Sequence, residues 1–301
     1  MSQNKIGMLR NTIFLLIIGL VIFQSCFSGE DKYVAIKVRG SDSEVNLVQA
    51  LAENFMDQDS LVSVGVTGGG SGAGIAALIN GKTDLANSSR EITEEELEYA
   101  QIAGVTPYPI VFAQDALALI THKDNPVDSL SIEEISAIYS GQINNWNEVE
   151  GGNNDGITLY GRQSSSGTYI YFRENIVKGE YKTSMIGMSG TAQIVDALKT
   201  DKRGIGYVSS GYLSENIMKD IKVLKINSDD NSKAYFPNKE NITSGTYPIT
   251  RPLLQFTNGK PEGKLLEFIL YQFSEEGMKI IEENGFYPAD YSTYNKELFQ
   301  K

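Results

Sequence analysis

Short apolar runs and amphipathic segments alternate along the part of the chain that follows residue 33. Three runs have the length and composition of buried strands: residues 34–38, 62–66 and 84–86. Between them, Leu47, Leu51 and Phe55 recur at helical spacing, and the apolar residues 75–79 begin a second helix. This order predicts a parallel sheet with helices on both faces, which places a ligand at the carboxyl ends of the strands.

Two longer apolar segments suit strands that cross between lobes. Residues 110–120 are apolar except for Gln114 and Asp115, and residues 249–256 form a candidate return crossing. We therefore predict an α/β protein with two lobes, each a mostly parallel sheet flanked by helices. The first lobe is expected to comprise residues 34–113 and 252–301, and the second lobe residues 114–251.

Further patterns indicate the elements of each lobe. Ser131 and Glu134 have the spacing of a capping box at a helix start, and Gly141 indicates the end of that helix. The remaining segments are two strands, a polar surface excursion and a terminal helix: residues 157–160, 204–208, 227–246 and 265–273.

The N-terminus has the pattern of an export signal. Lys5 and Arg10 precede an apolar run at residues 13–23, which is shorter than the ~20 residues of a membrane span. The only cysteine, Cys26, follows the small Ser25, as at a bacterial lipoprotein cleavage site. We expect residues 1–25 to be a signal peptide and residues 26–33 a tether to the membrane, with lipid such as palmitate on Cys26. An uncleaved signal anchor, or a signal peptide with an unrelated cysteine, are the alternatives.

Two loops rich in glycine and hydroxyl side chains each open a predicted helix. They are residues 68–74 (GGGSGAG) and 162–168 (RQSSSGT). A helix N-terminus offers unpaired N–H groups and a partial positive charge, and arginine adds a planar cationic fork, so both loops suit an anion. A third candidate loop, residues 87–90 (NSSR), follows another strand. The spacing predicts two lobes that close on one tetrahedral oxyanion.

The charge of the chain excludes some partners. The formal net charge is −12, and no basic stripe typical of a nucleic-acid-binding protein is present in the sequence. An anion would therefore have to be attracted by local N–H groups, hydroxyls and arginine, against the field of the whole protein.

Nucleotide binding and catalysis find little support in the residues. Gly68, Gly70 and Ala73 satisfy a loose dinucleotide pattern without the acid that binds ribose, and residues 76–83 resemble a P-loop that lacks its first glycine. The only histidine, His122, is expected to be solvated, and the chain has no nucleophile–base pair and no cluster of metal ligands. We therefore expect a binding protein with no catalytic residue, metal or cofactor.

Six segments occur in an order that resembles the phosphate-binding proteins (PstS type) of bacterial phosphate ABC importers: residues 40–43, 68–74, 84–90, 112–117, 161–168 and 204–208. The resemblance implies a type II periplasmic-binding-protein fold with two crossover strands. It implies a monomeric, extracytoplasmic solute-binding protein that hands inorganic phosphate to a permease with an ATPase subunit.

The resemblance also implies the site. The family's second-lobe ligands match Arg162, Ser166, Gly167 and Thr168. The family's hydroxyl at the glycine loop matches Ser71, and the hydroxyl in its first loop matches Ser43. Neighbouring loop residues complete the predicted phosphate site: Gly70, Ser89 and Arg90.

One departure from the family concerns Ser89, which stands where the best-known members have an aspartate that accepts a phosphate proton and rejects sulfate. We hypothesise that Asp115 replaces it, with Asp42 as the second choice, because a carboxylate repels an unprotonated oxyanion. Alternative functions are the binding of another oxyanion (sulfate, molybdate or a phosphonate), a secreted phosphoryl-transfer enzyme, and a phosphate sensor without a transporter.

Overall fold

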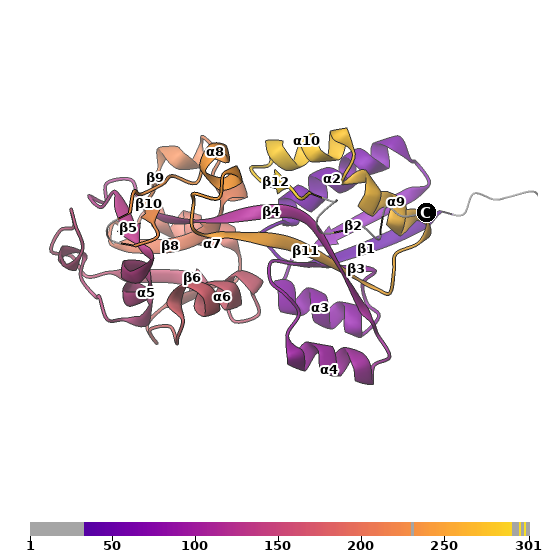
Figure 1. Cartoon of the computed structure of the whole chain (residues 1–301), viewed down its shortest axis with the longest axis horizontal. Helices are drawn as coiled ribbons and strands as arrows, with labels where there is room; N and C mark the ends of the chain where they lie inside the picture. Colours follow the sequence, from indigo (N-terminus) through magenta and orange to yellow (C-terminus); the bar gives the residue numbers. More distant parts are fainter. Residues whose placement is uncertain (1–32, 230–231, 291–294, 296–297, 299–301) are drawn as a thin grey trace, which may run out of the picture.

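The computed structural model describes residues 33–229, 232–290, 295 and 298, which form two lobes joined by two long strands (Figure 1). The predicted signal peptide, Cys26 and the tether up to residue 32 lie outside the described residues. Within the described part, no helix is long and apolar enough to cross a membrane.

The first lobe confirms the predicted alternation of strands and helices. β1 pairs in parallel with β2 on one side and with β3 on the other. Figure 1 shows α2, α9 and α10 on one face of this sheet and α3 and α4 on the other. The elements are β1 (Val34–Gly40), α2 (Val45–Gln58), β2 (Val62–Thr67), α3 (Ser71–Ile79), β3 (Leu85–Ser88), α4 (Glu94–Ile102), α9 (Gly263–Tyr271), α10 (Glu275–Glu283) and β12 (Tyr287–Pro288).

The two predicted crossings are β4 (Pro107–His122) and β11 (Thr250–Asn258). β4 pairs with β11 through residues 107–116 and then with β8 through residues 117–121, so one strand belongs to both lobes. The pairing is antiparallel and places Arg251 opposite Asp115. The predicted lobe boundaries remain a prediction.

The second lobe has β8, β6 and β7 as its main sheet, with β6 parallel to both neighbours. Its strands are β5 (Ser129–Ser131), β6 (Thr158–Arg162), β7 (Ile186–Met188), β8 (Gly204–Ser209), β9 (Ile221–Val223) and β10 (Lys225–Asn227). Its helices and helical turns are α5 (Ile132–Ser140), η1 (Trp146–Glu148), α6 (Gly167–Phe172), η2 (Arg173–Val177), α7 (Thr191–Leu198), η3 (Ser210–Tyr212), η4 (Ile217–Lys219) and α8 (Lys239–Thr243).

Local sequence signals are confirmed at several element ends. Ser131 and Glu134 form the predicted capping box of α5, and Gly141 ends that helix with a φ of 83°, which favours glycine. The prediction that His122 is solvated is wrong, because β4 extends to this residue and leaves it 6% exposed. Its Nδ1 accepts the N–H of Asp124 at 3.0 Å.

Each lobe has its own apolar core. In the first lobe, Leu47, Leu51 and Phe55 of α2 pack against the buried face of the sheet. In the second lobe, a cluster of similar size surrounds Trp146, Tyr139 and other aromatic residues. Two cores joined by only two strands are the arrangement in which lobes can move relative to each other.

Candidate functional site

Four hydroxyl side chains from both lobes meet where the lobes face each other. Ser43 Oγ lies 2.8 Å from Thr168 Oγ1, and Ser71 Oγ lies 3.3 Å from Ser89 Oγ. Ser89 Oγ and Thr168 Oγ1 are 3.5 Å apart, which joins the two pairs. All four residues are buried. We call these four residues the hydroxyl cluster.

The glycine loop brings backbone, rather than side chains, to the facing lobe. Gly69 and Gly70 have φ values of 122° and 92°, which suit glycine and little else. A Cβ at Gly70 would lie 2.7 Å from the carbonyl oxygen of Ser165. The N–H of Gly72 donates to that same oxygen at 3.1 Å, so the two lobes touch through their main chains.

The loop of the second lobe is packed equally tightly. A Cβ on Gly167 would lie 2.3 Å from Ser71 Oγ and 2.7 Å from Ser89 Oγ, so even a methyl group has no room. Ser166 is the N-cap of α6, and its Oγ accepts the N–H of Tyr169 at 3.4 Å. The capping role leaves the serine at the edge of the cluster.

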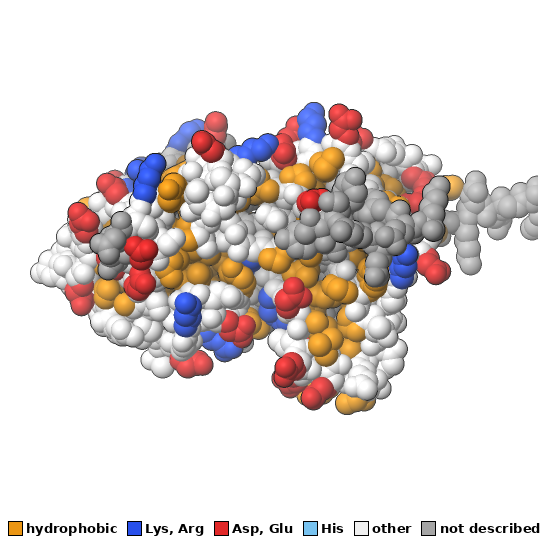
Figure 2. Space-filling view, in the orientation of Figure 1, with side chains coloured by type: hydrophobic (Ala, Val, Ile, Leu, Met, Phe, Trp, Pro, Cys, Tyr) orange, Lys and Arg blue, Asp and Glu red, His pale blue; other side chains and the backbone are white. Residues whose placement is uncertain are grey.

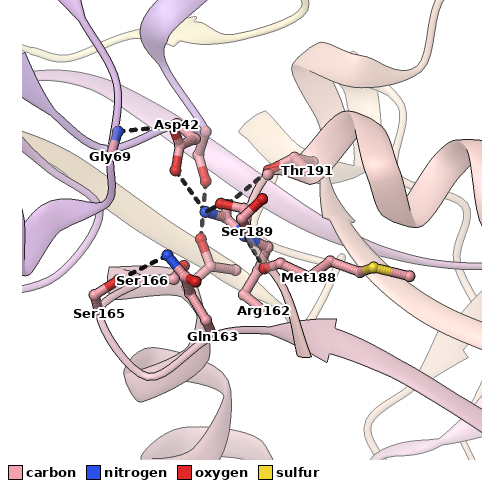
Figure 3. Close-up of polar contacts among 12 residues, drawn as sticks. Asp42, Gly69, Arg162, Gln163, Ser165, Ser166, Met188, Ser189 and Thr191 are labelled. Carbon is pink, nitrogen blue, oxygen red and sulfur yellow. Dashed lines mark hydrogen bonds and ion pairs between the residues drawn. The ribbon is translucent and has the colours of Figure 1, made fainter. Parts of the chain in front are cut away.

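Arg162 ends β6 and is 1% exposed (Figure 3). In its own lobe it donates to the Met188 carbonyl, the Ser189 carbonyl and Thr191 Oγ1 at 3.3, 2.9 and 2.9 Å. Its Nη2 also lies 2.5 Å from Oδ2 of Asp42 in the first lobe. Asp42 in turn accepts the Gly69 N–H at 2.9 Å, so this ion pair ties Arg162 to the glycine loop.

An aromatic stack supports Arg162 from below. The rings of Phe172 and Tyr207 are stacked with centroids 4.1 Å apart, and the Tyr207 hydroxyl accepts the Arg162 N–H at 3.2 Å. Burial raises the pKa of Tyr207 to about 12, so its hydroxyl stays neutral at physiological pH.

Arg90 lies beside the hydroxyl cluster rather than in it. Its guanidinium donates to both carboxylate oxygens of Glu96, at 2.7 and 2.8 Å, and to the Glu91 carbonyl. Burial alone would raise the pKa of Glu96, but the hydrogen bonds from Arg90 and Thr93 hold it below its usual range. Thr93 and Glu96 form a capping box at the start of α4, a pattern that can be read in the sequence. The capping box holds the Glu96 carboxylate in the position where it pairs with Arg90.

Asp115 lies at the centre of the crossing strands, fully buried, and pairs with Arg251, which the sequence analysis missed. Its Oδ2 accepts from Nε and Nη2 of Arg251 at 3.1 and 2.8 Å, and its Oδ1 accepts from Ser209 and Ser210 at 2.6 and 3.5 Å. A carboxylate has about four acceptor positions, and the Ser210 proton is shared with the Gly285 carbonyl at 3.0 Å, so Asp115 keeps at most one position for a phosphate proton.

Arg251 reaches from this pair to the hydroxyl cluster. It donates to Ser43 Oγ at 3.3 Å and to the Ser89 carbonyl at 3.2 Å. The signal that could have found it is a single cation in the apolar return crossing, matched by a single acid in the outgoing one. A second buried guanidinium therefore stands directly behind Ser43 and Ser89.

A groove of about 460 Å³ opens beside the site between the start of α4 and α6. Its lining includes Ser89, Arg90, Tyr171 and Arg251. Figure 2 shows a notch between the two lobes along the lower edge of the molecule. Among the residues that the structure describes, no three His, Cys, Asp or Glu side chains gather as metal ligands would.

Comparison with known proteins relates this arrangement to one family. The model of the PBP superfamily domain matches residues 28–276 of this chain. The phosphate-binding protein PstS of Staphylococcus aureus (strain MRSA252) is 32% identical over 264 residues, which cover 86% of this chain and 80% of the relative. PstS of Pseudomonas aeruginosa (strain PAO1) is 29% identical over 86% of this chain and 84% of its own length.

Solved structures show the same relationship. A candidate phosphate ABC transporter substrate-binding protein of Clostridium perfringens, crystallised with bound phosphate, has a TM-score of 0.75 and 28% identity. That comparison covers 85% of this chain and 100% of the other. An ABC-type phosphate transport receptor of Vibrio cholerae has a TM-score of 0.66 and 29% identity, over 84% of this chain and 100% of that one.

Proposed function

The chain belongs to the PBP superfamily and, within it, to the family of the phosphate-binding protein PstS, and from this premise we propose that it captures inorganic phosphate for an ABC-type importer. Its relatives are substrate-binding proteins of transporters rather than enzymes. The chain is accordingly a binding protein that works outside the cytoplasm.

The observation that carries this proposal is the contact of hydroxyls across the lobes. Ser43 of the first lobe and Thr168 of the second lie 2.8 Å apart, and both are buried. Hydroxyls can each donate to an anion without adding charge, and their exclusion from water strengthens each bond. Hydroxyls from both lobes converge on one point, so parting and closing of the lobes around an anion would let all of them donate to it.

Two guanidinium groups supply the positive charge that the acidic protein otherwise lacks. Arg162 stands at the second-lobe loop and Arg251 behind Ser43 and Ser89. Each is paired with one carboxylate, Asp42 and Asp115 respectively. The charge around the site is therefore close to balanced, which favours neutral donors as the main source of affinity.

For discrimination against sulfate we propose Asp42 before Asp115, in reverse of the order expected from the sequence. Asp42 uses one position of each carboxylate oxygen, on Gly69 and Arg162, and keeps acceptor positions free. Asp115 holds three donors at 3.1 Å or less and shares the Ser210 proton with the Gly285 carbonyl, so at most one of its positions is left. A free acceptor next to the anion would bond a protonated phosphate oxygen and repel sulfate, which has no proton.

We further propose that the protein is exported, anchored through lipid on Cys26, and monomeric, and that it delivers phosphate to a permease with its own ATPase subunit. The sequence pattern at residues 5–26 supports the anchor, and the family membership supports the partners. Mass spectrometry of the processed N-terminus tests the anchor, because an unmodified Cys26 would contradict it.

The test of the function is calorimetric titration of the purified, anion-free protein with phosphate and then sulfate, at about pH 5.5 and 8. We expect tight 1:1 phosphate binding and no response to sulfate. Thr168→Val is expected to weaken phosphate binding at least ~10-fold, since a hydrogen bond to a charged group contributes ~1.5–3 kcal/mol. The exposed Thr200 provides the matched control, Thr200→Val, which should bind as the wild type does.

Other outcomes would redirect the proposal. Comparable binding of both anions would indicate a general oxyanion receptor, and binding of neither would contradict an anion site at the hydroxyl cluster. Hydrolysis of a phosphate ester, with or without divalent metal, would favour the phosphoryl-transfer enzyme.

A further inference from the structure

Glu44 is a buried acid that the binding site does not explain. It stands between Ser43 of the hydroxyl cluster and the first residue of α2, and it is fully buried. Its side chain makes no capping hydrogen bond to α2, although its carbonyl accepts the Val48 N–H at 2.9 Å. The carboxyl group therefore points into the protein instead of capping the helix or reaching solvent.

The carboxyl group of Glu44 lacks hydrogen-bond partners. Neither oxygen has one within the described ranges 33–229 and 232–290 or at residues 295 and 298. The Ser41 hydroxyl lies near enough to favour the ionised form slightly, but it too makes no hydrogen bond of normal geometry in these ranges. An ionised carboxylate that is buried without donors is among the costliest groups in a protein.

Arg251 is the cation whose charge acts on Glu44, and most of its hydrogen-bond donors are used by other groups. Arg251 donates twice to Asp115, once to Ser43 and once to the Ser89 carbonyl, which occupies four of its five donor positions. Asp115 receives three donors at 3.1 Å or less and shares the Ser210 proton with the Gly285 carbonyl, whereas Glu44 receives none among the described residues. Of these two neighbouring acids, Asp115 is thus built to hold a negative charge and Glu44 to hold a proton.

We infer that Glu44, next to Ser43 of the hydroxyl cluster, is held as a neutral carboxylic acid. The group formed by Glu44, Asp115 and Arg251 then carries no net charge behind Ser43 and Ser89. This inference rests on the proposed function for its consequence and on this buried group for its geometry. Ionisation of Glu44 would give the group a net negative charge beneath the anion, and phosphate would bind less tightly.

The balance of forces on Glu44 agrees with this geometry. Burial is the largest influence and raises the pKa of Glu44 well above its usual range. Arg251 of β11 lowers it and Asp115 of β4 raises it, while Ser41 in its own loop lowers it. These are the charged and titratable groups that face Glu44 from the elements around it.

The first test measures folding and needs no phosphate. An acid with a raised pKa in the folded state loses stability as pH climbs above the unfolded value of ~4.3, until the folded pKa is reached. Glu44→Gln has no proton to lose and escapes this penalty. The folding equilibrium constant of Glu44→Gln relative to wild type should therefore increase by up to about tenfold for each pH unit from pH ~5 until the folded pKa of Glu44 is reached.

Controls keep this test decisive. Glu53→Gln makes the same change on the exposed face of α2, and its ratio to wild type should change less than about threefold over this range. A flat ratio for Glu44→Gln would overturn the inference. Glu44→Leu is the second variant, expected to show the same pH dependence. If neither folds, infrared detection of a protonated carboxyl in the wild type at pH 7 decides.

The second test measures phosphate affinity between pH ~8 and 10, where inorganic phosphate stays a dianion. Weakening in wild type that is absent from Glu44→Gln supports the link to the site, and constant affinity in both supports a Glu44 that stays neutral throughout. Equal weakening in both overturns the link. Failure of the wild type to bind phosphate would reject the proposed function, whereas the folding test would still stand.

Discussion

Two arginine–aspartate pairs flank the hydroxyl cluster, and they are built in opposite ways. Asp115 and Arg251 face each other across the antiparallel ladder of β4 and β11, and both side chains are fully buried. Asp42 and Arg162 come from different lobes, and the Asp42 side chain keeps 17% of its surface exposed. The first pair is part of the crossing strands, and the second requires the lobes to meet.

This difference assigns the pairs different roles. A pair on neighbouring strands persists when the lobes separate, so Arg251 presents a fixed charge behind Ser43 and Ser89 at all times. If the lobes open and close on the anion as proposed, a pair between lobes would form on closure and be lost on opening, and we expect Arg162 to exchange partners as the anion enters and leaves. The fixed pair should govern stability, and the closing pair should govern binding.

Asp115→Asn should have the largest effect, on stability. Removing one partner of a buried pair leaves Arg251 uncompensated and should lower the free energy of unfolding by about 3–5 kcal/mol. Denaturant unfolding of the phosphate-free protein measures it. The exposed pair of Asp196 and Lys199 gives the control, because Asp196→Asn should cost less than about 1 kcal/mol. A loss below ~1 kcal/mol for Asp115→Asn would refute the fixed role.

Arg162→Lys should act next, and mainly on binding. A lysine cannot serve Thr191, the two carbonyls and Asp42 together, so closure loses a charge-assisted contact. We expect phosphate affinity to fall about 10- to 100-fold by calorimetry. Arg173→Lys, in a surface pair with Glu174, should bind normally. An affinity within twofold of wild type would show that Arg162 plays no part in closure.

Asp42→Asn should have the smallest effect, on selectivity. The amide keeps the size of the side chain but loses the carboxylate that repels sulfate, so the preference for phosphate over sulfate should narrow about tenfold. Competition calorimetry with both anions measures this preference. Asp115→Asn serves as the comparison and should leave the preference unchanged. If instead Asp115→Asn alone narrows it, Asp115 is the proton acceptor first predicted from the sequence.

Local patterns predicted most of the fold. The strands before and after α2 and the crossing strand with Asp115 follow from apolar runs of recognisable length. The cap at Ser131 follows from short-range spacing. Each of these elements depends on residues that are close together in the chain, which is why it could be predicted from one sequence. α10 was missed because its acidic residues conceal a narrow apolar stripe.

The site was only partly predictable, because its contacts span long distances along the chain. Arg251 lies 136 residues from Asp115, and their pairing depends on strand register, which no local pattern encodes. Glu44 precedes an amphipathic helix, where an acid normally caps or faces water, so its burial had no signal. For Arg90 a local signal did exist. Its partner Glu96 lies only six residues away, so their ion pair could have been expected from the sequence.

The absence of a Cβ on Gly167 has a consequence for how such a site can change. The side chains of Ser71 and Ser89 fill the space around this residue, and on the facing loop Gly70 is confined by the Ser165 carbonyl. Shortening a side chain cannot make room beside Gly70, where the neighbour is the backbone carbonyl of Ser165, and beside Gly167 it would remove a hydroxyl of the cluster. A descendant of this protein that accepted a larger anion would have to change the angle between the two lobes in the closed state. That change would have to come from the crossing strands β4 and β11. The size of the ligand is thus set by the crossing strands. Substitutions of the residues that line the site can change only which chemical groups contact the ligand.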